Sequence, residues 1–116
     1  MRIQRGSIYV ADLNPAHGAE PGKVRPVVVV QTDLLNPTHS STLICPMTTH
    51  VKKSSRYLRV HLNALETGLD KDSDIMVDQL RAIDNRRLTK QAGHVPSVQM
   101  RELARNLQIL LDLDQF

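Results

Sequence analysis

The sequence predicts a mainly β domain with one C-terminal helix, folded as a small, strongly bent sheet or partly open barrel against which the helix packs. Two observations support this prediction. Polar and apolar residues alternate with a period of two through the first three quarters of the chain, and the period becomes helical after Ser97. A length of 116 residues corresponds to one domain, residues 1–116, without room for a second core.

The first two predicted strands flank a turn-rich loop. Alternation in residues 8–12 predicts the first strand, and the following loop, residues 14–23, contains two prolines and two glycines. Residues 25–31 contain a run of four valines, which is typical of a strand buried on both faces. We therefore expect this second strand to be the centre of the sheet.

Further strands are predicted along the rest of the β region. Their expected ranges are residues 42–47, 57–62, 75–83 and 88–95. In the strand at 57–62, Arg59 and His61 should share the face opposite to Val60. Residues 33–36 and 84–87 are expected to form single helical turns.

The C-terminal helix is predicted from an apolar stripe. Ser97 is a suitable N-cap after Pro96. The apolar positions that follow at helical spacing are Met100, Leu103, Ala104, Leu107, Leu110 and Leu111. We expect this stripe to pack on the sheet, and the alternative is that part of it meets a second subunit.

The charge of the chain is unevenly distributed. Residues 1–60 hold eight Lys/Arg and three Asp/Glu, a net charge of +5, whereas residues 61–116 hold seven and nine, a net charge of −2. Four basic residues and no acid lie between Thr48 and Val60, namely Lys52, Lys53, Arg56 and Arg59. This segment is the best candidate for contacting phosphates, and the alternative is a solvated loop. Because no signal peptide or membrane span is present, we expect a cytoplasmic protein.

Several kinds of site are not predicted. The five histidines never lie at zinc-binding spacing, so no metal is expected. Residues 70–74 resemble the start of a calcium loop, but Ile75 replaces the required glycine, and a solvated acidic turn is the better interpretation. No phosphate-binding glycine pattern is present, so no nucleotide cofactor is expected. Cys45, the single cysteine, is interpreted as a small buried thiol rather than a nucleophile.

Polar residues at strand ends remain as candidates for chemistry. Arg25 opens the valine-rich strand directly after the loop that contains Glu20, and Thr48 and Thr49 follow the third strand. A guanidinium on a rigid strand can stabilise negative charge that develops on phosphorus, and a hydroxyl can bind a phosphate oxygen. Gln79 lies within the predicted strand at 75–83. Taken singly, each has a structural explanation: an Arg25–Glu20 ion pair, a strand-end hydroxyl and a rim amide. Together they indicate a phosphodiester site that needs no metal.

Motifs in a consistent order cover nearly the whole chain. They are Arg5-Gly6-Ser7-Ile8-Tyr9, Asp12-Leu13, Gly18-Ala19-Glu20, Gly22-Lys23-Val24-Arg25-Pro26-Val27-Val28-Val29, Thr48-Thr49, Gly68-Leu69, Asp72-Ser73, Asp78-Gln79-Leu80-Arg81-Ala82-Ile83-Asp84 and Arg87-Leu88. With these motifs the chain resembles the MazF/PemK family of type II toxin-antitoxin toxins. The resemblance implies a small SH3-like barrel of the MazF/PemK/CcdB toxin type and a homodimer. It also implies a sequence-specific endoribonuclease that cuts single-stranded RNA without metal and leaves a 2′,3′-cyclic phosphate and a 5′-hydroxyl.

The resemblance also implies roles for individual residues. The catalytic arginine and threonine of the family match Arg25 and Thr48, and Glu20 and Gln79 match positions at the RNA groove. Ala19 departs from the usual pattern, which has a serine there, so a hydroxyl contact to the substrate is missing. The basic residues Lys52, Lys53 and Arg56 are expected to contact RNA as well.

The resemblance implies a further partner, a cognate antitoxin whose acidic, apolar tail competes for the positive groove. Two other functions remain open at this point. One is a non-catalytic, protein-binding toxin on the same fold, of the gyrase-poisoning type, although such a module needs neither Arg25 nor Thr48. The other is an RNA-binding adaptor without catalysis, which the basic half alone would predict.

Overall fold

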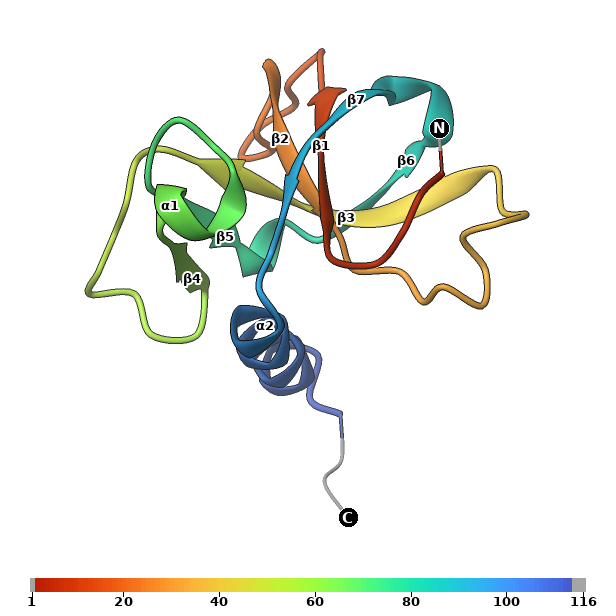
Figure 1. Ribbon diagram of the computed structural model, residues 1–116. Helices are drawn as coiled ribbons and strands as arrows, with labels where there is room; N and C mark the ends of the chain where they lie inside the picture. The colour runs from red at the N-terminus through yellow and green to blue at the C-terminus, as the bar shows by residue number, and fades with distance from the viewer. Residues whose placement is uncertain (1, 114–116) are drawn as a thin grey trace.

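The computed structural model describes residues 2–113 and has a mainly antiparallel sheet with a C-terminal helix against it (Figure 1). The strands are β1 (Ser7–Asp12), β2 (Val24–Val29), β3 (Ser41–Thr48), β4 (Arg59–Leu62), β5 (Ser73–Met76), β6 (Arg81–Asp84) and β7 (Leu88–His94). The helices are α1 (Ala64–Thr67), α2 (Ser97–Leu110) and the short 3-10 helices η1 (Val77–Gln79) and η2 (Asn85–Arg87). The predicted fold class is confirmed.

The sheet is ordered β4-β5-β3-β2-β1-β7, and β6 pairs with β3 beside this path. Strand β2 lies between β1 and β3, as predicted for the centre of the sheet. Its valines divide between two cores, because Val28 packs with Ile8 and Cys45 on one face while Val27 and Val29 pack with the other cluster. Burying a valine stabilises the fold by roughly 1.5–3 kcal/mol, so this strand holds both cores together.

The predicted strand at residues 75–83 is wrong as a single strand. Strand β5 pairs Ile75 with Met47, whereas β6 pairs Arg81 with Ile44. On β3, Met47 and Ile44 are three residues apart, whereas their partners Ile75 and Arg81 are six residues apart. A continuous strand would need only three, so the segment between Ile75 and Arg81 contains three residues too many for unbroken pairing. They form η1, and β3 thereby pairs with two strands of different register.

Smaller elements differ from the expectations in part. The helical turn expected at 84–87 is η2, capped by the Asp84 carboxylate, which accepts the Arg86 N–H. Residues 33–36 lie in hydrogen-bonded turns without a helix. The fourth strand begins at Arg59 rather than at residue 57. Helix α1 was not predicted, because four residues are too short to show a period.

Helix α2 packs against β4 and η1 and buries Leu103 completely, with Met100 and Leu107 partly buried beside it. The expected packing is therefore confirmed for these three residues, whereas Ala104 is exposed and does not belong to the buried face. Toward the helix end, Leu110 and Leu111 are exposed. Within residues 2–113, no helix has the length and apolar character needed to cross a membrane.

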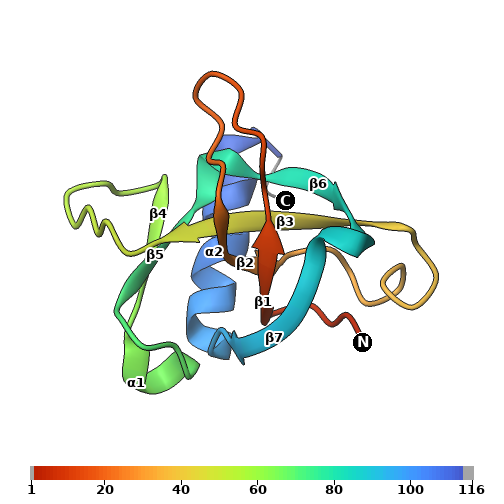
Figure 2. The ribbon, with the colours of Figure 1, turned by 90° about the horizontal axis from the view of Figure 1, so that it is seen from above.

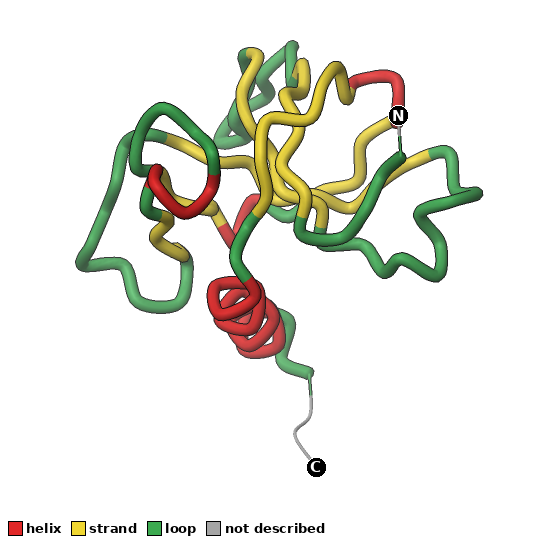
Figure 3. Tube along the Cα trace, viewed as in Figure 1, coloured by secondary structure: helices red, strands yellow, loops and turns green. Residues whose placement is uncertain are grey.

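Two loops border the strand ends that carry predicted site residues, one before β2 and one after β3, and they project from the sheet in different directions (Figure 2). One connects β1 to β2 and the other, at residues 49–58, connects β3 to β4 (Figure 2). Figure 3 shows both as stretches without helix or strand. Every site residue predicted before Tyr57 lies in one of these loops or at the strand ends beside them.

Candidate active site

Arg25 and Thr48 come together at neighbouring strand ends. Arg25 is the second residue of β2 and Thr48 is the last of β3. The β2–β3 ladder ends at the pair Val27–Pro46, with Arg25 two residues before Val27 and Thr48 two residues after Pro46. Residues two apart on a strand point to the same face, so Arg25 and Thr48 share the face of that pair. Both residues are half-buried, so their side chains keep access to a ligand.

The guanidinium of Arg25 is held in place by the backbone. Its Nε donates to the carbonyl oxygen of Gly22 at 2.9 Å, and one terminal nitrogen donates to the carbonyl oxygen of Met47 at 3.3 Å. Among the described residues no carboxylate pairs with Arg25, so the alternative of an ion pair with Glu20 is wrong. The remaining N–H groups are free for an anion, which suits the planar donor fork of an arginine.

The Gly22 carbonyl depends on a tight loop. A Cβ at Gly22 would lie 2.7 Å from the Cβ of Ala16, which is closer than real contacts allow. The ends of the same loop are joined by a bond from the Leu13 N–H to the Lys23 carbonyl, at 2.9 Å. The loop thus presents a fixed acceptor to Arg25, and its tip carries Glu20, which is exposed.

The hydroxyl of Thr48 has its hydrogen available. Its Oγ1 accepts the N–H of His50 at 3.1 Å, so the interaction uses a lone pair rather than the hydroxyl hydrogen. The Thr48 hydroxyl can therefore donate to a phosphate oxygen beside the Arg25 guanidinium.

The other predicted site residues are less closely associated with this pair. Gln79 lies in η1, not in a strand, and no hydrogen bond within the described chain connects its side chain to Arg25 or Thr48. Lys52, Lys53 and Arg56 are exposed in the loop at 49–58. The Arg56 guanidinium carbon lies 5.4 Å from the ring centroid of Tyr57.

A buried carboxylate beside Thr48 was missed from the sequence. Asp74 lies opposite Thr48 in the β3–β5 register and is fully buried, whereas Asp70 and Asp72 are exposed. The interpretation of residues 70–74 as a solvated turn is therefore wrong for Asp74. The sequence signal that could have revealed it is the placement of Arg59 and His61 on one strand face. Two side chains that can carry positive charge there need a carboxylate acceptor on the neighbouring strand.

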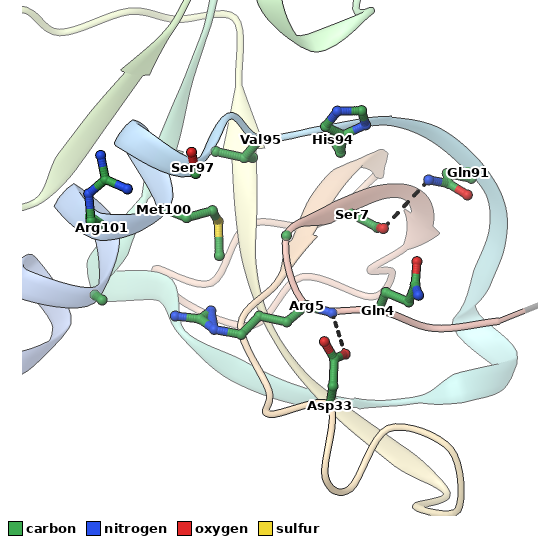
Figure 4. A pocket seen from close by; sticks show the side chains of 12 residues that line it. Gln4, Arg5, Ser7, Asp33, Gln91, His94, Val95, Ser97, Met100 and Arg101 are labelled. Atoms are coloured by element: carbon green, nitrogen blue, oxygen red, sulfur yellow. Dashed lines mark hydrogen bonds between the residues drawn. The ribbon is translucent and has the colours of Figure 1, made fainter.

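Two hollows of the described chain have linings that include neither Arg25 nor Thr48. One, of about 580 Å³, lies between the N-terminal segment and α2 and is lined by Arg5, His94 and Arg101 among others (Figure 4). The other, of about 500 Å³, includes Pro26 and Thr49 in its wall.

Cys45 is buried in the core, and burial together with the charge of Asp78 raises the pKa of its thiol to about 12. A thiol with this pKa stays protonated at neutral pH and is not a nucleophile. The interpretation of Cys45 as a small buried side chain is confirmed.

Comparisons with known proteins identify the family and the fold. Residues 4–111 match the model of the PemK-like, MazF-like toxin family of type II toxin-antitoxin systems. Endoribonuclease EndoA of Bacillus subtilis is 36% identical over 116 residues, which is the whole length of both chains. The solved structure of Mycobacterium tuberculosis toxin MazF-mt6 is 26% identical with a TM-score of 0.78, covering 94% of this chain and 99% of that one.

The fold is also shared with more distant structures. MazF from Deinococcus radiodurans is 24% identical with a TM-score of 0.85, covering 97% of this chain and 99% of its own. Because a family model matches nearly the whole chain and a full-length relative is 36% identical, the chain belongs to the PemK-like, MazF-like toxins of type II toxin-antitoxin systems.

Proposed function

We propose that this endoribonuclease toxin cuts single-stranded RNA at Arg25 and Thr48, without a metal ion, and leaves a 2′,3′-cyclic phosphate and a 5′-hydroxyl. One observation carries the assignment of the site. The guanidinium of Arg25 is fixed by two backbone carbonyls, one of them that of Met47 directly before Thr48, whose hydroxyl hydrogen is available. Preorganised donors of this kind stabilise a transition state more than a ground state.

The reaction follows from the chemistry of these two groups. The 2′-oxygen of the RNA attacks the adjacent phosphorus, and the bond from phosphorus to the 5′-oxygen breaks. The 2′-hydroxyl loses a proton and the leaving 5′-oxygen gains one. Arg25 stabilises the extra negative charge on the phosphorane, and Thr48 donates to a non-bridging oxygen. Losing one such donor costs about 3 to 4 kcal/mol, or roughly 100- to 1000-fold in rate.

Substrate binding involves residues around the pair. Lys52, Lys53 and Arg56 supply positive charge from the loop that follows Thr48, and phosphate contacts of this type weaken with salt. Glu20 at the tip of the other loop and Gln79 in η1 contact base edges, which is how single-stranded RNA is read. These contacts make the cleavage selective for sequence.

Partners follow from the same surface. A homodimer provides a longer groove than one chain of 116 residues can form. Solved neighbours include MazE–MazF complexes from Deinococcus radiodurans, which have the same fold. A cognate antitoxin with an acidic, apolar tail would bind across Lys52 and Lys53 and block RNA. The protein acts in the cytoplasm, where its RNA substrate is found.

The test is cleavage of a long RNA in EDTA by the wild type, Arg25→Ala and Thr48→Val. The wild type should make discrete cuts with cyclic phosphate ends, and both variants should be at least about 100-fold slower. Arg86→Ala is the matched control, because Arg86 is exposed and pairs only with Asp84. The assignment of the site is refuted if Arg25→Ala cuts as fast as the wild type.

Two other outcomes would replace the proposed function. Intact RNA together with stoichiometric capture of a topoisomerase would show a protein-binding toxin. Salt-dependent RNA binding without cleavage would show an adaptor.

A further inference from the structure

A row of polar side chains crosses four strands on one face of the sheet. His61 on β4 pairs with Asp74 on β5, and Asp74 pairs with Thr48 on β3. Arg25 on β2 joins this row beside Thr48, because its terminal nitrogen donates to the carbonyl oxygen of Met47. Because opposite residues share a face, the catalytic pair and Asp74 lie on the same side of the sheet.

Asp74 is the only acidic side chain among residues 2–113 that is fully buried. Its Oδ2 accepts the Lys52 N–H at 2.8 Å and a terminal N–H of Arg59 at 3.0 Å, and its Oδ1 is paired with Nδ1 of His61. A buried carboxylate is unfavourable unless such donors surround it. The bonds on Asp74 therefore hold their donors in place.

These donors belong to the segment that directly follows Thr48. Lys52 contributes its backbone N–H, so the path of the chain is fixed at that residue. The same Arg59 nitrogen that contacts Asp74 also donates to the His50 carbonyl at 3.0 Å, and the His50 N–H donates to the Thr48 hydroxyl at 3.1 Å. A continuous set of hydrogen bonds thus connects Asp74 through Arg59 and His50 to the catalytic hydroxyl.

We propose that Asp74 is a positioning residue of the ribonuclease site, which orients the Thr48 hydroxyl and fixes residues 49–53 so that Lys52 and Lys53 meet RNA. The inference rests on the proposed function of Thr48 and of the two lysines. Asp74 touches no substrate and acts through the segment that it holds.

Charge alone predicts the opposite effect of removing Asp74. A negative group beside the basic segment that contains Lys52 and Arg59 repels RNA, so Asp74→Asn would tighten binding if the carboxylate only contributed charge. If Asp74 positions the segment, the same substitution weakens binding and slows cleavage. Whether Asp74→Asn tightens or weakens RNA binding therefore decides between a purely electrostatic effect and a positioning role.

The experiment compares Asp74→Asn with Asp84→Asn, which makes the same change of charge at an exposed carboxylate paired with Arg86. We expect Asp74→Asn to lower kcat about 100-fold, as a misplaced catalytic group does. The plot of log affinity against log salt for an uncleavable RNA should become less steep by about 0.7 for each phosphate that the variant no longer binds. The control should show neither effect.

A double-mutant cycle tests the route of the effect. Because Asp74 acts through the segment, adding Lys53→Ala to Asp74→Asn should weaken RNA binding no further than Asp74→Asn alone. Full additivity would overturn the inference, and so would an Asp74→Asn variant that binds and cleaves like the control. If Asp74→Asn does not fold by circular dichroism, Arg59→Gln replaces it, because that variant keeps Lys52 and His61 on Asp74.

Comparing Asp74→Asn with the variants of Arg25 and Thr48 separates this inference from the proposed function. If Arg25→Ala and Thr48→Val cleave normally, the proposed site is wrong. If those two variants are inactive while Asp74→Asn matches the control, only the positioning role is wrong.

Discussion

Replacing Arg25 by lysine separates the charge of the side chain from its geometry. The guanidinium is fixed by bonds to the carbonyls of Gly22, at 2.9 Å, and Met47, at 3.3 Å. A lysine keeps the positive charge but has no planar fork that can bind both carbonyls and still present donors to phosphate. The change therefore removes orientation and leaves attraction.

The size of the expected rate loss depends on whether the orientation of the guanidinium acts in the ground state or in the transition state. Attraction to the RNA phosphates is present in the ground state, so KM should stay nearly constant. The bonds to the phosphorane form only in the transition state, and losing a preorganised donor there costs about 3 to 4 kcal/mol. We expect kcat for Arg25→Lys to fall roughly 100- to 1000-fold, nearly as far as for Arg25→Ala.

The assay is single-turnover cleavage of a labelled oligonucleotide in EDTA, at several enzyme concentrations so that binding and chemistry are separated. Arg86→Lys, an exposed arginine exchanged in the same way, is the control. If Arg25→Lys cleaves within about threefold of the wild type while Arg25→Ala is inactive, charge alone suffices and the geometric reasoning is refuted.

Three further predictions concern stability. Cys45 in the folded protein should not react with a disulfide reagent at pH 8 but should react in urea. Its thiol pKa is raised from 9.0 to about 12 by folding, so the stability that the protonated thiol contributes is lost as pH rises from about 9 to 12. This loss should be absent in Cys45→Ala. Gly93→Ala should destabilise the fold by about 1 to 3 kcal/mol in a urea titration, because the added Cβ would lie 2.0 Å from the Thr67 carbonyl oxygen. Unchanged stability would contradict the close packing of α1 on β7. Leu103→Ala should cost about 2 to 5 kcal/mol, while the exposed Arg105→Ala should stay within about 0.5 kcal/mol.

The parts of the fold that could be predicted are those whose pattern is local. The valine run of β2 is found buried as its pattern indicates, and the apolar stripe of α2 is found so at Met100, Leu103 and Leu107. The break at η1 does not show, because apolar residues run from Ile75 to Val77 and resume at Leu80, with only Asp78 and Gln79 between them. The break is set by the pairing of β3 with two strands of different register, which is a tertiary property.

The site was predictable to a similar extent. Arg25 and Thr48 were predicted from strand ends and motifs, because antiparallel neighbours bring the end of one strand to the start of the other. Asp74 was not, since an aspartate in an acidic run looks solvated until its donors are known. Those donors, on Lys52, Arg59 and His61, come from a loop and a strand that only the folded chain brings to it.

The pairing of β1 with β7 has a consequence for synthesis of the protein. β1 is the first strand to leave the ribosome, and β7, which borders it in the sheet, is the last. The core around Val28 likewise includes Val95 and Leu103. A nascent chain therefore lacks the strand and the core residues that support β1 and β2 until nearly its whole length has been translated. In this order, β2 and the Arg25 that it carries gain their full core only after β7 and α2 have been translated.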